Sequence, residues 1–289
     1  MQWEAFDPLI QTALEEDGAR ADVTTDSLID PALRAVADVV VKAPGVICGL
    51  PAARRTAHLV DPRLEVETFR QDGDEVGPGE VVACVRGSAA SILRAERTML
   101  NFLQHLSGVA TATHKLARLV EGTGAAIYDT RKTPAGWRAL DKYAVRCGGG
   151  RNHRMGLSDQ VLIKDNHLKL RAGTTNPTAA AVGEAVRTAR RAAPGLLVEV
   201  EVTALDELRE AVRAGADIVM LDNMSPDQVR RAVAEVRRLC AGRPRPELEA
   251  SGGITPQTVR AYAEAGVDRI SVGALTHSAQ ALDISMLIR

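Results

Sequence analysis

The sequence predicts an α/β protein with a small α+β unit at the start and a barrel of parallel strands after it. Three observations lead to this prediction. Strand-like and helix-like segments alternate over short connections in the second part of the chain. The first part instead carries several short β-like runs between helical segments. Neither the dinucleotide-binding glycine fingerprint nor a P-loop is present, which favours a barrel over a doubly wound sheet.

The first part of the chain is expected to begin with helix and to continue as short strands. Residues 1–33 read as mostly helical. Four β-like runs follow, punctuated by glycine and proline, at 35–41, 45–50, 64–69 and 80–86. Residues 88–120 then carry apolar side chains at roughly helical spacing, which predicts one or two helices.

The stretch from residue 196 onward has the most regular pattern. Strands are expected at 196–202, 216–223, 247–253 and 267–275, and helices at 205–215, 225–240 and 255–266. The last two helices open with Ser-Pro or Thr-Pro, a common helix start. Such alternation indicates a parallel sheet built from right-handed crossover units.

Composition argues against several classes of function. The formal net charge of −1 and an aromatic fraction of 3% give no general sign of nucleic-acid binding. No apolar run has the length of a membrane span, and the acidic, amphipathic start lacks a signal-peptide layout, so we expect a cytoplasmic protein. The four cysteines form no C-x-x-C pair and are expected to be reduced, with Cys147 a small buried residue rather than a nucleophile.

Positive charge is concentrated in residues 129–171, which hold ten Lys or Arg against four Asp or Glu. Arg131 and Lys132 follow the apolar run AAIYD, and Lys164 ends the run QVLIK. Charged residues at the carboxyl ends of barrel strands point into the mouth of the barrel. The other cations of this stretch without such a placement are expected on a solvated face; they are Arg138, Lys142, Lys169 and Arg171.

Acidic residues and glycines at later strand ends complete the predicted mouth. Asp222 is one acid, and the other is Glu199 or Glu201, since both face the same side of their strand. The segments Ser251-Gly252-Gly253 and Gly273 follow the last two strands, where barrels often bind phosphate. Together with the segment CGGGRNHR (147–154), these residues indicate a multiply anionic substrate carried with a divalent metal.

The central segment TRKTPAGWRALDKYAVRCGGGRNHRMGLSDQVLIKDNH (130–167) resembles the signature of quinolinate phosphoribosyltransferases. The likeness continues in order along the chain, through EDG…DVTT (16–25), RAERTMLNFLQHLSGVAT (94–111), EVEV (199–202), MLDN (220–223), EASGGIT (249–255) and VGALTHS (272–278). The resemblance implies an N-terminal α/β sandwich domain and a C-terminal α/β barrel of incomplete type. We therefore expect a sandwich domain over 1–110, joined by the tail 276–289, and a barrel domain over 111–275.

The resemblance also implies an activity, a metal and an assembly. Family members join quinolinate to phosphoribosyl pyrophosphate (PRPP) with Mg²⁺, giving nicotinate mononucleotide, pyrophosphate and CO₂ in NAD biosynthesis. They act as homodimers or as assemblies of dimers. By the same resemblance, Arg97 of AERTMLN reaches the active site of the partner subunit.

Residue roles follow by the same resemblance. The carboxylates of quinolinate are expected to meet Arg131, His153, Arg154 and Lys164, with Thr130 nearby. Lys132 is expected to face the pyrophosphate, and Glu201, the second acid of EVEV, to act with Asp222 on ribose hydroxyls and metal. The 5′-phosphate is expected to bind at Ser251, Gly252, Gly273 and His277.

Four alternatives stay open from the sequence. One is a related phosphoribosyltransferase of molybdenum-transport operons with another acceptor, and another is a transferase that uses nicotinate without decarboxylation. A third is a Schiff-base aldolase with Lys164 as nucleophile, which needs an apolar or cationic site. The fourth is a metabolite sensor without activity, which predicts losses among the mouth residues.

Overall fold

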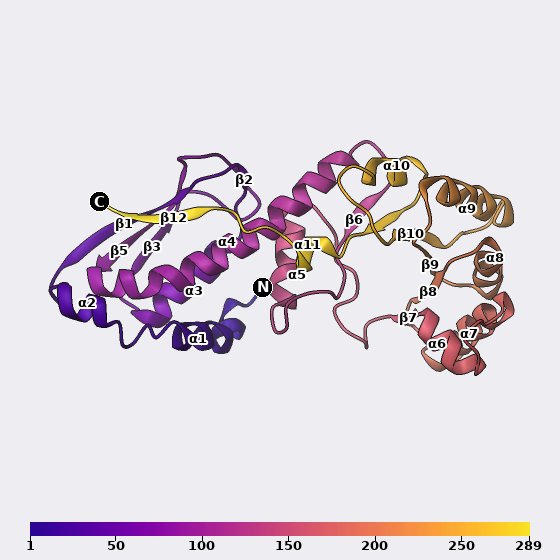
Figure 1. Ribbon diagram of the computed structural model, residues 1–289, viewed down its shortest axis with the longest axis horizontal. Coiled ribbons are helices and arrows are strands. Elements are labelled where there is room, and N and C mark those ends of the chain that lie inside the picture. The colour runs from indigo at the N-terminus through magenta and orange to yellow at the C-terminus, as the bar shows by residue number, and fades with distance from the viewer. The chain divides into compact units, whose positions relative to one another are not determined.

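The computed structural model describes residues 1–289, which divide into two units with separate sheets. Unit 1 comprises Met1–His114, Pro134–Gly149 and Leu275–Arg289, and unit 2 comprises Lys115–Thr133 and Gly150–Ala274. The chain therefore passes between the units several times, as the colours of Figure 1 show. No helix is both long enough and apolar enough to cross a membrane.

Unit 1 is built on an antiparallel sheet of strand order β12-β1-β5-β3, with a separate two-stranded pair, β2 and β4. The strands are β1 (Arg34–Val41), β2 (Gly45–Val46), β3 (Glu65–Thr68), β4 (Glu75–Val76), β5 (Val81–Ser88) and β12 (Ile284–Ile288). The helices are η1 (Trp3–Phe6), α1 (Asp7–Glu16), α2 (Val23–Leu28), α3 (Leu50–Val60), α4 (Ala89–Leu119), α5 (Arg138–Cys147) and α11 (Ala274–His277). The 31-residue helix α4 begins in unit 1 and ends in unit 2.

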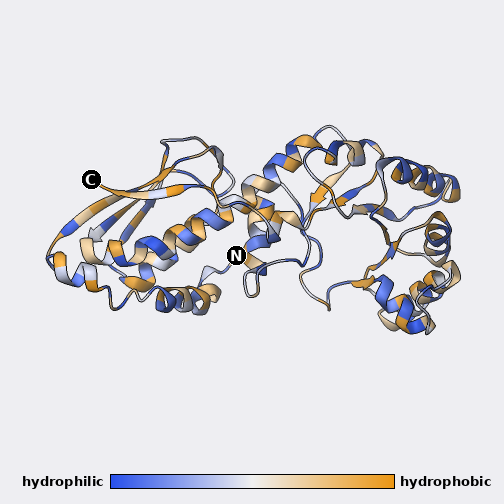
Figure 2. Cartoon of the chain, in the orientation of Figure 1, coloured by the Kyte–Doolittle hydropathy of each residue, from blue (hydrophilic) through white to orange (hydrophobic).

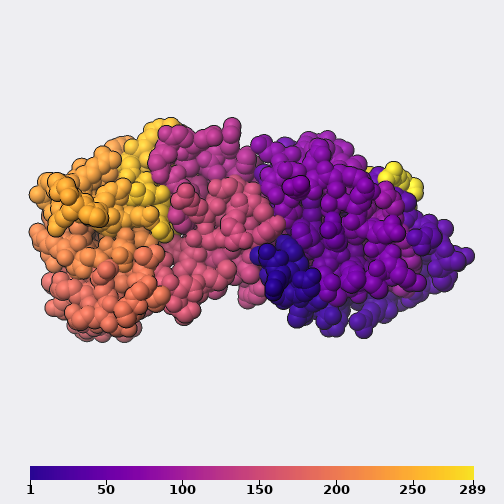
Figure 3. Space-filling view, turned by 180° about the vertical axis from the view of Figure 1, so that it is seen from behind, coloured from indigo at the N-terminus to yellow at the C-terminus, as the bar shows by residue number.

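The C-terminal tail belongs to unit 1 because β12 pairs with β1 in antiparallel register. Figure 3 shows the last residues, in yellow, at the surface among the indigo and purple residues of this unit. The segment 134–149, expected in the barrel domain, also groups with unit 1. Its helix α5 buries Leu140, Ala144 and Val145 in one apolar cluster with Ile10 and Phe102, so packing assigns it there.

Unit 2 holds six parallel strands in the order β6-β11-β10-β9-β8-β7. The strands are β6 (Ala126–Tyr128), β7 (Val161–Ile163), β8 (Val198–Val202), β9 (Ile218–Asp222), β10 (Glu247–Ser251) and β11 (Arg269–Ser271). The helices are α6 (Asp165–Ala172), α7 (Ala179–Ala192), α8 (Leu205–Ala214), α9 (Pro226–Leu239) and α10 (Val259–Glu264). Because β6 and β7 do not pair with each other, the ring of strands stays open, which agrees with the expected incomplete barrel.

Local signals explain where the helices of unit 2 begin and end. The side chain of Ser225 caps α9, and Gln228 Oε1 accepts a hydrogen bond from the Ser225 N–H at 2.8 Å. Helix α8 ends at Gly215, whose φ of 83° is open to glycine at little cost. Apolar residues buried along one side of α9 recur three and four positions apart, and Figure 2 shows the blue and orange bands that result on these helices.

Candidate active site

Strand register places the carboxyl ends of the unit 2 strands at one edge of the sheet. Asp222 of β9 lies beside Ser251 of β10, Ser251 beside Ser271 of β11, and Ser271 beside Tyr128 of β6. The segments that follow these strands therefore start from the same edge. The candidates of unit 2 all lie on or directly after this edge, or on the loop that leads to β7; they are Thr130, Arg131, Lys132, His153, Arg154, Lys164, Glu201, Asp222, Ser251, Gly252 and Gly273.

The loop after β6 and the segment around His153 are tied together by Asp129. This carboxylate is fully buried and accepts hydrogen bonds from the N–H of His153 at 2.8 Å and from Asn152 Nδ2 at 2.6 Å. Burial, and next the charge of Arg131, lower the pKa of Arg154. The positive charge of Arg131 thus acts on a second cation of the predicted set.

Glu199 and Glu201 share a face of β8 but lie at different depths. Glu201 has a partly exposed side chain, and its Oε1 lies 2.5 Å from Lys164 Nζ. Glu199 is fully buried and accepts a hydrogen bond from Gln160 Nε2 at 2.5 Å. Alternation left the two acids equivalent, and depth distinguishes them: Glu201 is at the accessible end of the strand.

The turn after β10 has room only for glycine at position 252. Gly252 has a φ of +99°, and a Cβ there would lie 2.2 Å from Asn223 Oδ1. Asn223, with a φ of 54°, donates its N–H to the Ser251 carbonyl at 2.9 Å. This hydrogen bond therefore joins the ends of β9 and β10 beside Asp222. The backbone of Gly252, which has no side chain, is left accessible to a ligand.

Two candidates, Arg97 and His277, belong to unit 1. Arg97 is exposed on α4. His277 is exposed at the end of α11, and its Nδ1 lies 2.6 Å from Ser278 Oγ.

A buried polar cluster at the strands of unit 2 was missed by sequence reasoning. His153 Nε2 lies 3.0 Å from Glu199 Oε2 and 3.7 Å from Glu249 Oε1, and Ser271 Oγ donates to the same Glu249 oxygen at 2.5 Å. Burial, and next the charge of Glu199, raise the pKa of Glu249 to about 7. The signal available in the sequence was the pair of acids inside the apolar runs VEVEV and ELEAS, since a buried acid needs partners.

Two sets of side chains hold potential metal-ligand atoms within 4.8 Å of one another: His153, Glu199 and Glu249 in unit 2, and Cys48, Asp72 and Cys147 in unit 1. The first set is fully buried and already linked by internal contacts. Glu201 and Asp222 differ from it because both are partly exposed, on adjacent strands, and offer the carboxylate oxygens that Mg²⁺ prefers.

The set in unit 1 brings together two cysteines, Cys48 and Cys147, that are far apart in the sequence. Cys48 is fully buried and Cys147 is half-buried, with their sulfur atoms within 4.8 Å. The Cys48 thiol as hydrogen-bond donor holds the pKa of Cys147 below its usual value, against the opposing effect of burial. Cys147 was expected to be a buried filler, but it is a thiol with a defined polar environment.

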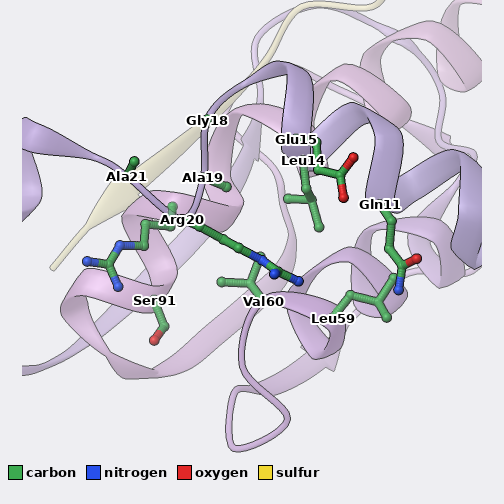
Figure 4. Close-up of a pocket in the computed structure, with 11 residues that line it drawn as sticks. Gln11, Leu14, Glu15, Gly18, Ala19, Arg20, Ala21, Leu59, Val60 and Ser91 are labelled. Carbon is green, nitrogen blue, oxygen red and sulfur yellow. The ribbon is translucent and has the colours of Figure 1, made fainter.

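Unit 1 also contains a pocket of about 380 Å³ between α1, α3 and the start of α4. Figure 4 shows Gln11, Leu14 and Glu15 of α1 on one side of it, with Leu59 and Val60 of α3 below. None of the residues predicted for the site lines this pocket.

Comparison with known proteins gives one consistent result. Residues 22–107 match the model for the quinolinate phosphoribosyl transferase N-terminal domain, and residues 109–287 match that for the C-terminal domain. The chain is 40% identical to the probable nicotinate-nucleotide pyrophosphorylase [carboxylating] of Bacillus subtilis, over 94% of this chain and 89% of that protein. It is also 40% identical to the nicotinate-nucleotide pyrophosphorylase [carboxylating] of Mycobacterium leprae, over 99% and 98% of the two chains.

Solved structures agree with the sequence relatives. The nicotinate-nucleotide pyrophosphorylase of Francisella tularensis superposes with a TM-score of 0.90 at 38% identity, covering 100% of this chain and 98% of the other. NadC from Streptococcus pyogenes gives a TM-score of 0.91 at 38% identity with the same coverage.

Proposed function

The chain belongs to the quinolinate phosphoribosyltransferase family, and from this premise we propose that it transfers phosphoribose from PRPP to quinolinate with loss of CO₂. The products are nicotinate mononucleotide and pyrophosphate. The observation that supports the proposal is the placement of Arg131 and Lys164 after strands β6 and β7, with Arg154 on the loop that leads to β7. Three cations suit an acceptor with two carboxylates, whereas nicotinate has only one.

The acceptor is held by these cations, with Thr130 and His153 beside them. A guanidinium group can bind a carboxylate through two parallel hydrogen bonds, so Arg131 and Arg154 fix the plane of the pyridine ring. Lys164 adds a compact charge. Its partner is the Glu201 carboxylate, whereas a Schiff-base lysine needs an apolar or cationic site, and this disfavours the aldolase alternative.

The donor lies along the later strand ends. Lys132 faces the pyrophosphate, and Glu201 and Asp222 hold ribose hydroxyls. The 5′-phosphate binds at the glycine-bearing turns, through Ser251, Gly252 and Gly273. The narrow turn at Gly252 supports this assignment, because a backbone without Cβ lets phosphate oxygens approach the N–H groups.

The metal is Mg²⁺, and the residues that fit it are Glu201 and Asp222. Both are partly exposed carboxylates on adjacent strands, as a cation that remains partly hydrated needs. When bound, Mg²⁺ offsets negative charge on the departing pyrophosphate.

The protein's own contribution is mainly alignment of two anions that repel each other. The pyridine nitrogen of quinolinate forms a bond to the anomeric carbon as the bond to pyrophosphate breaks, and no side-chain nucleophile is needed. Lys132 stabilises the charge on the leaving group. The alkylated ring nitrogen is then cationic and stabilises the carbanion left on the adjacent carbon when the carboxylate departs as CO₂, and this carbon takes up a proton from water. Arg131 and Arg154 keep the other carboxylate in place.

The assembly is a homodimer in which Arg97 completes the site of the partner subunit. Arg97 is exposed on α4, which is compatible with this role. Arg97→Ala and Asp222→Ala variants, each inactive alone, are expected to regain activity when mixed, because a mixed dimer has one intact site.

The four cysteines without disulfides fit a reducing cytoplasm.

The test is to incubate the protein with quinolinate, PRPP and Mg²⁺ and to follow nicotinate mononucleotide and CO₂ together. Equal appearance of both products, with no reaction when nicotinate replaces quinolinate, is expected. Absence of product from quinolinate would refute the proposal. Nicotinate mononucleotide formed without matching CO₂ would refute the coupling of transfer to decarboxylation.

A further inference from the structure

Polar contacts link Arg154 to His153, Gln160 and Glu199 in a closed circuit, and these three partners are buried or nearly buried. Its backbone N–H donates to His153 Nδ1 at 2.8 Å, and its Nη1 donates to the backbone carbonyl of Gln160 at 3.0 Å. The amide of Gln160 donates to Glu199 Oε2 at 2.5 Å, and His153 Nε2 lies 3.0 Å from that same oxygen. Hydrogen bonds therefore restrain Arg154, Gln160 and Glu199 in turn, and His153 Nε2 completes the circuit through its proximity to Glu199 rather than through a hydrogen bond.

His153 directs both ring nitrogens into the protein. Because Nδ1 accepts the Arg154 N–H, the proton of the neutral ring is on Nε2. Nε2 faces the carboxylates of Glu199 and Glu249, and the residue is 9% exposed. The ring thus contacts the Arg154 backbone on one side and lies near two carboxylates on the other.

Gln160 connects the buried carboxylate of Glu199 to the guanidinium group of Arg154. It is 7% exposed, and its side chain anchors to Glu199 while its carbonyl accepts from Arg154. The segment 152–160 has no helix or strand, so side-chain contacts of this kind determine its conformation.

We propose that His153, Gln160 and Glu199 are positioning residues that hold the Arg154 guanidinium in place for a carboxylate of the acceptor. The inference rests on the proposed function and adds to it the residues that set acceptor affinity. Glu249, held by Ser271, supports the circuit from the next strand but one.

A physical reason for such a circuit is the repulsion between cations. Arg154 is partly buried and feels the positive charge of Arg131, which opposes close approach of the two guanidinium groups when no anion is bound. Holding it beforehand removes an ordering cost from acceptor binding. Glu199 of the circuit shares strand β8 with Glu201, which is proposed to act on the ribose of PRPP.

The test is the variant Gln160→Leu, which keeps the approximate size of the side chain and removes its amide. The KM for quinolinate is expected to rise on the order of tenfold, as for loss of one well-placed contact to an ion. The KM for PRPP and kcat are expected to change less than about threefold, because the restraint acts on one arginine. The matched control is Gln104→Leu, which removes the hydrogen bond from a glutamine amide to the Ile284 carbonyl in unit 1.

A pair of variants at Glu199 separates positioning from folding. Glu199→Gln keeps an acceptor oxygen for the Gln160 amide and is expected to retain the wild-type KM for quinolinate within about threefold, whereas Glu199→Leu is expected to match Gln160→Leu. If Glu199→Leu fails to fold, Gln160→Leu still decides. Equal rises of both KM values, or no rise for quinolinate, would overturn the inference while leaving the proposed function intact. A wild-type protein that does not use quinolinate would overturn both.

Discussion

The protein is expected to lose stability as pH rises through neutrality, and replacing Glu249 with glutamine is expected to abolish most of that loss. The side chain is fully buried, and one of its oxygens, Oε2, has no hydrogen-bond partner. Burial, and next the charge of Glu199, raise its pKa from 4.5 to about 7. The folded protein therefore binds a proton that the unfolded chain releases above about pH 4.5. The resulting stability is fully present below that pH and is lost as pH rises through about 7.

The magnitude follows from the two pKa values. Between 4.5 and about 7, at roughly 1.4 kcal/mol per pH unit, the wild type loses about 3 kcal/mol of unfolding free energy through this one group. Glutamine keeps an oxygen for Ser271 Oγ, which donates to Glu249 at 2.5 Å, and carries no charge to bury. The variant is therefore expected to gain about 3 kcal/mol relative to wild type between about pH 5 and pH 8.

Urea unfolding of both proteins at these two pH values measures the difference. Circular dichroism is the appropriate signal, since both tryptophans, Trp3 and Trp137, belong to unit 1 and Glu249 belongs to unit 2. Glu247→Gln, on the same strand but half-exposed, is the matched control. An identical change in unfolding free energy for wild type and Glu249→Gln across this range would show that the reasoning is wrong.

Three further outcomes are expected. Arg154→Lys is expected to raise the KM for quinolinate at least about tenfold in steady-state assays, because lysine cannot make a bidentate contact; an unchanged KM contradicts this. Gly252→Ala is expected to lower stability by about 1–3 kcal/mol and to raise the KM for PRPP, since its φ is +99° and Asn223 occupies the Cβ position; an unchanged melting temperature would be the contrary result. Iodoacetamide is expected to modify Cys147 first, because its pKa is lowered while Cys48 is buried; peptide mass spectrometry showing equal labelling of both argues against it.

The order and type of the elements could be predicted because their causes are local. The strand expected at 216–223 is β9 at Ile218–Asp222, and the helix expected at 225–240 is α9 at Pro226–Leu239. A capping serine and a run of apolar residues act within a few positions of the chain, so they can be read without a fold. The prediction of 45–50 as a strand was only partly right: β2 covers Gly45–Val46, and α3 begins at Leu50.

The strand-end rule was informative for single residues but not for their depth. It selected Arg131 and Lys164, because a residue directly after a barrel strand has a defined direction. It could not separate Glu199 from Glu201, since residues two positions apart share a face. Only the packing of Gln160 and His153 over Glu199 distinguishes the buried acid from the accessible one.

The sequence by itself determined the α/β class, the alternation of strands and helices, and the motifs that identify the family, because each depends on residues close together in the chain. The tertiary structure decided that 134–149 packs with unit 1, that Cys48 meets Cys147, and that Gln160 links Arg154 to Glu199. The last two of these contacts join residues between 6 and 99 positions apart (154 and 160; 48 and 147) through side chains without a periodic pattern. Burial and hydrogen bonding determine which of these residues meet once the strands have come together. The spacing of residues along the chain therefore does not predict these contacts.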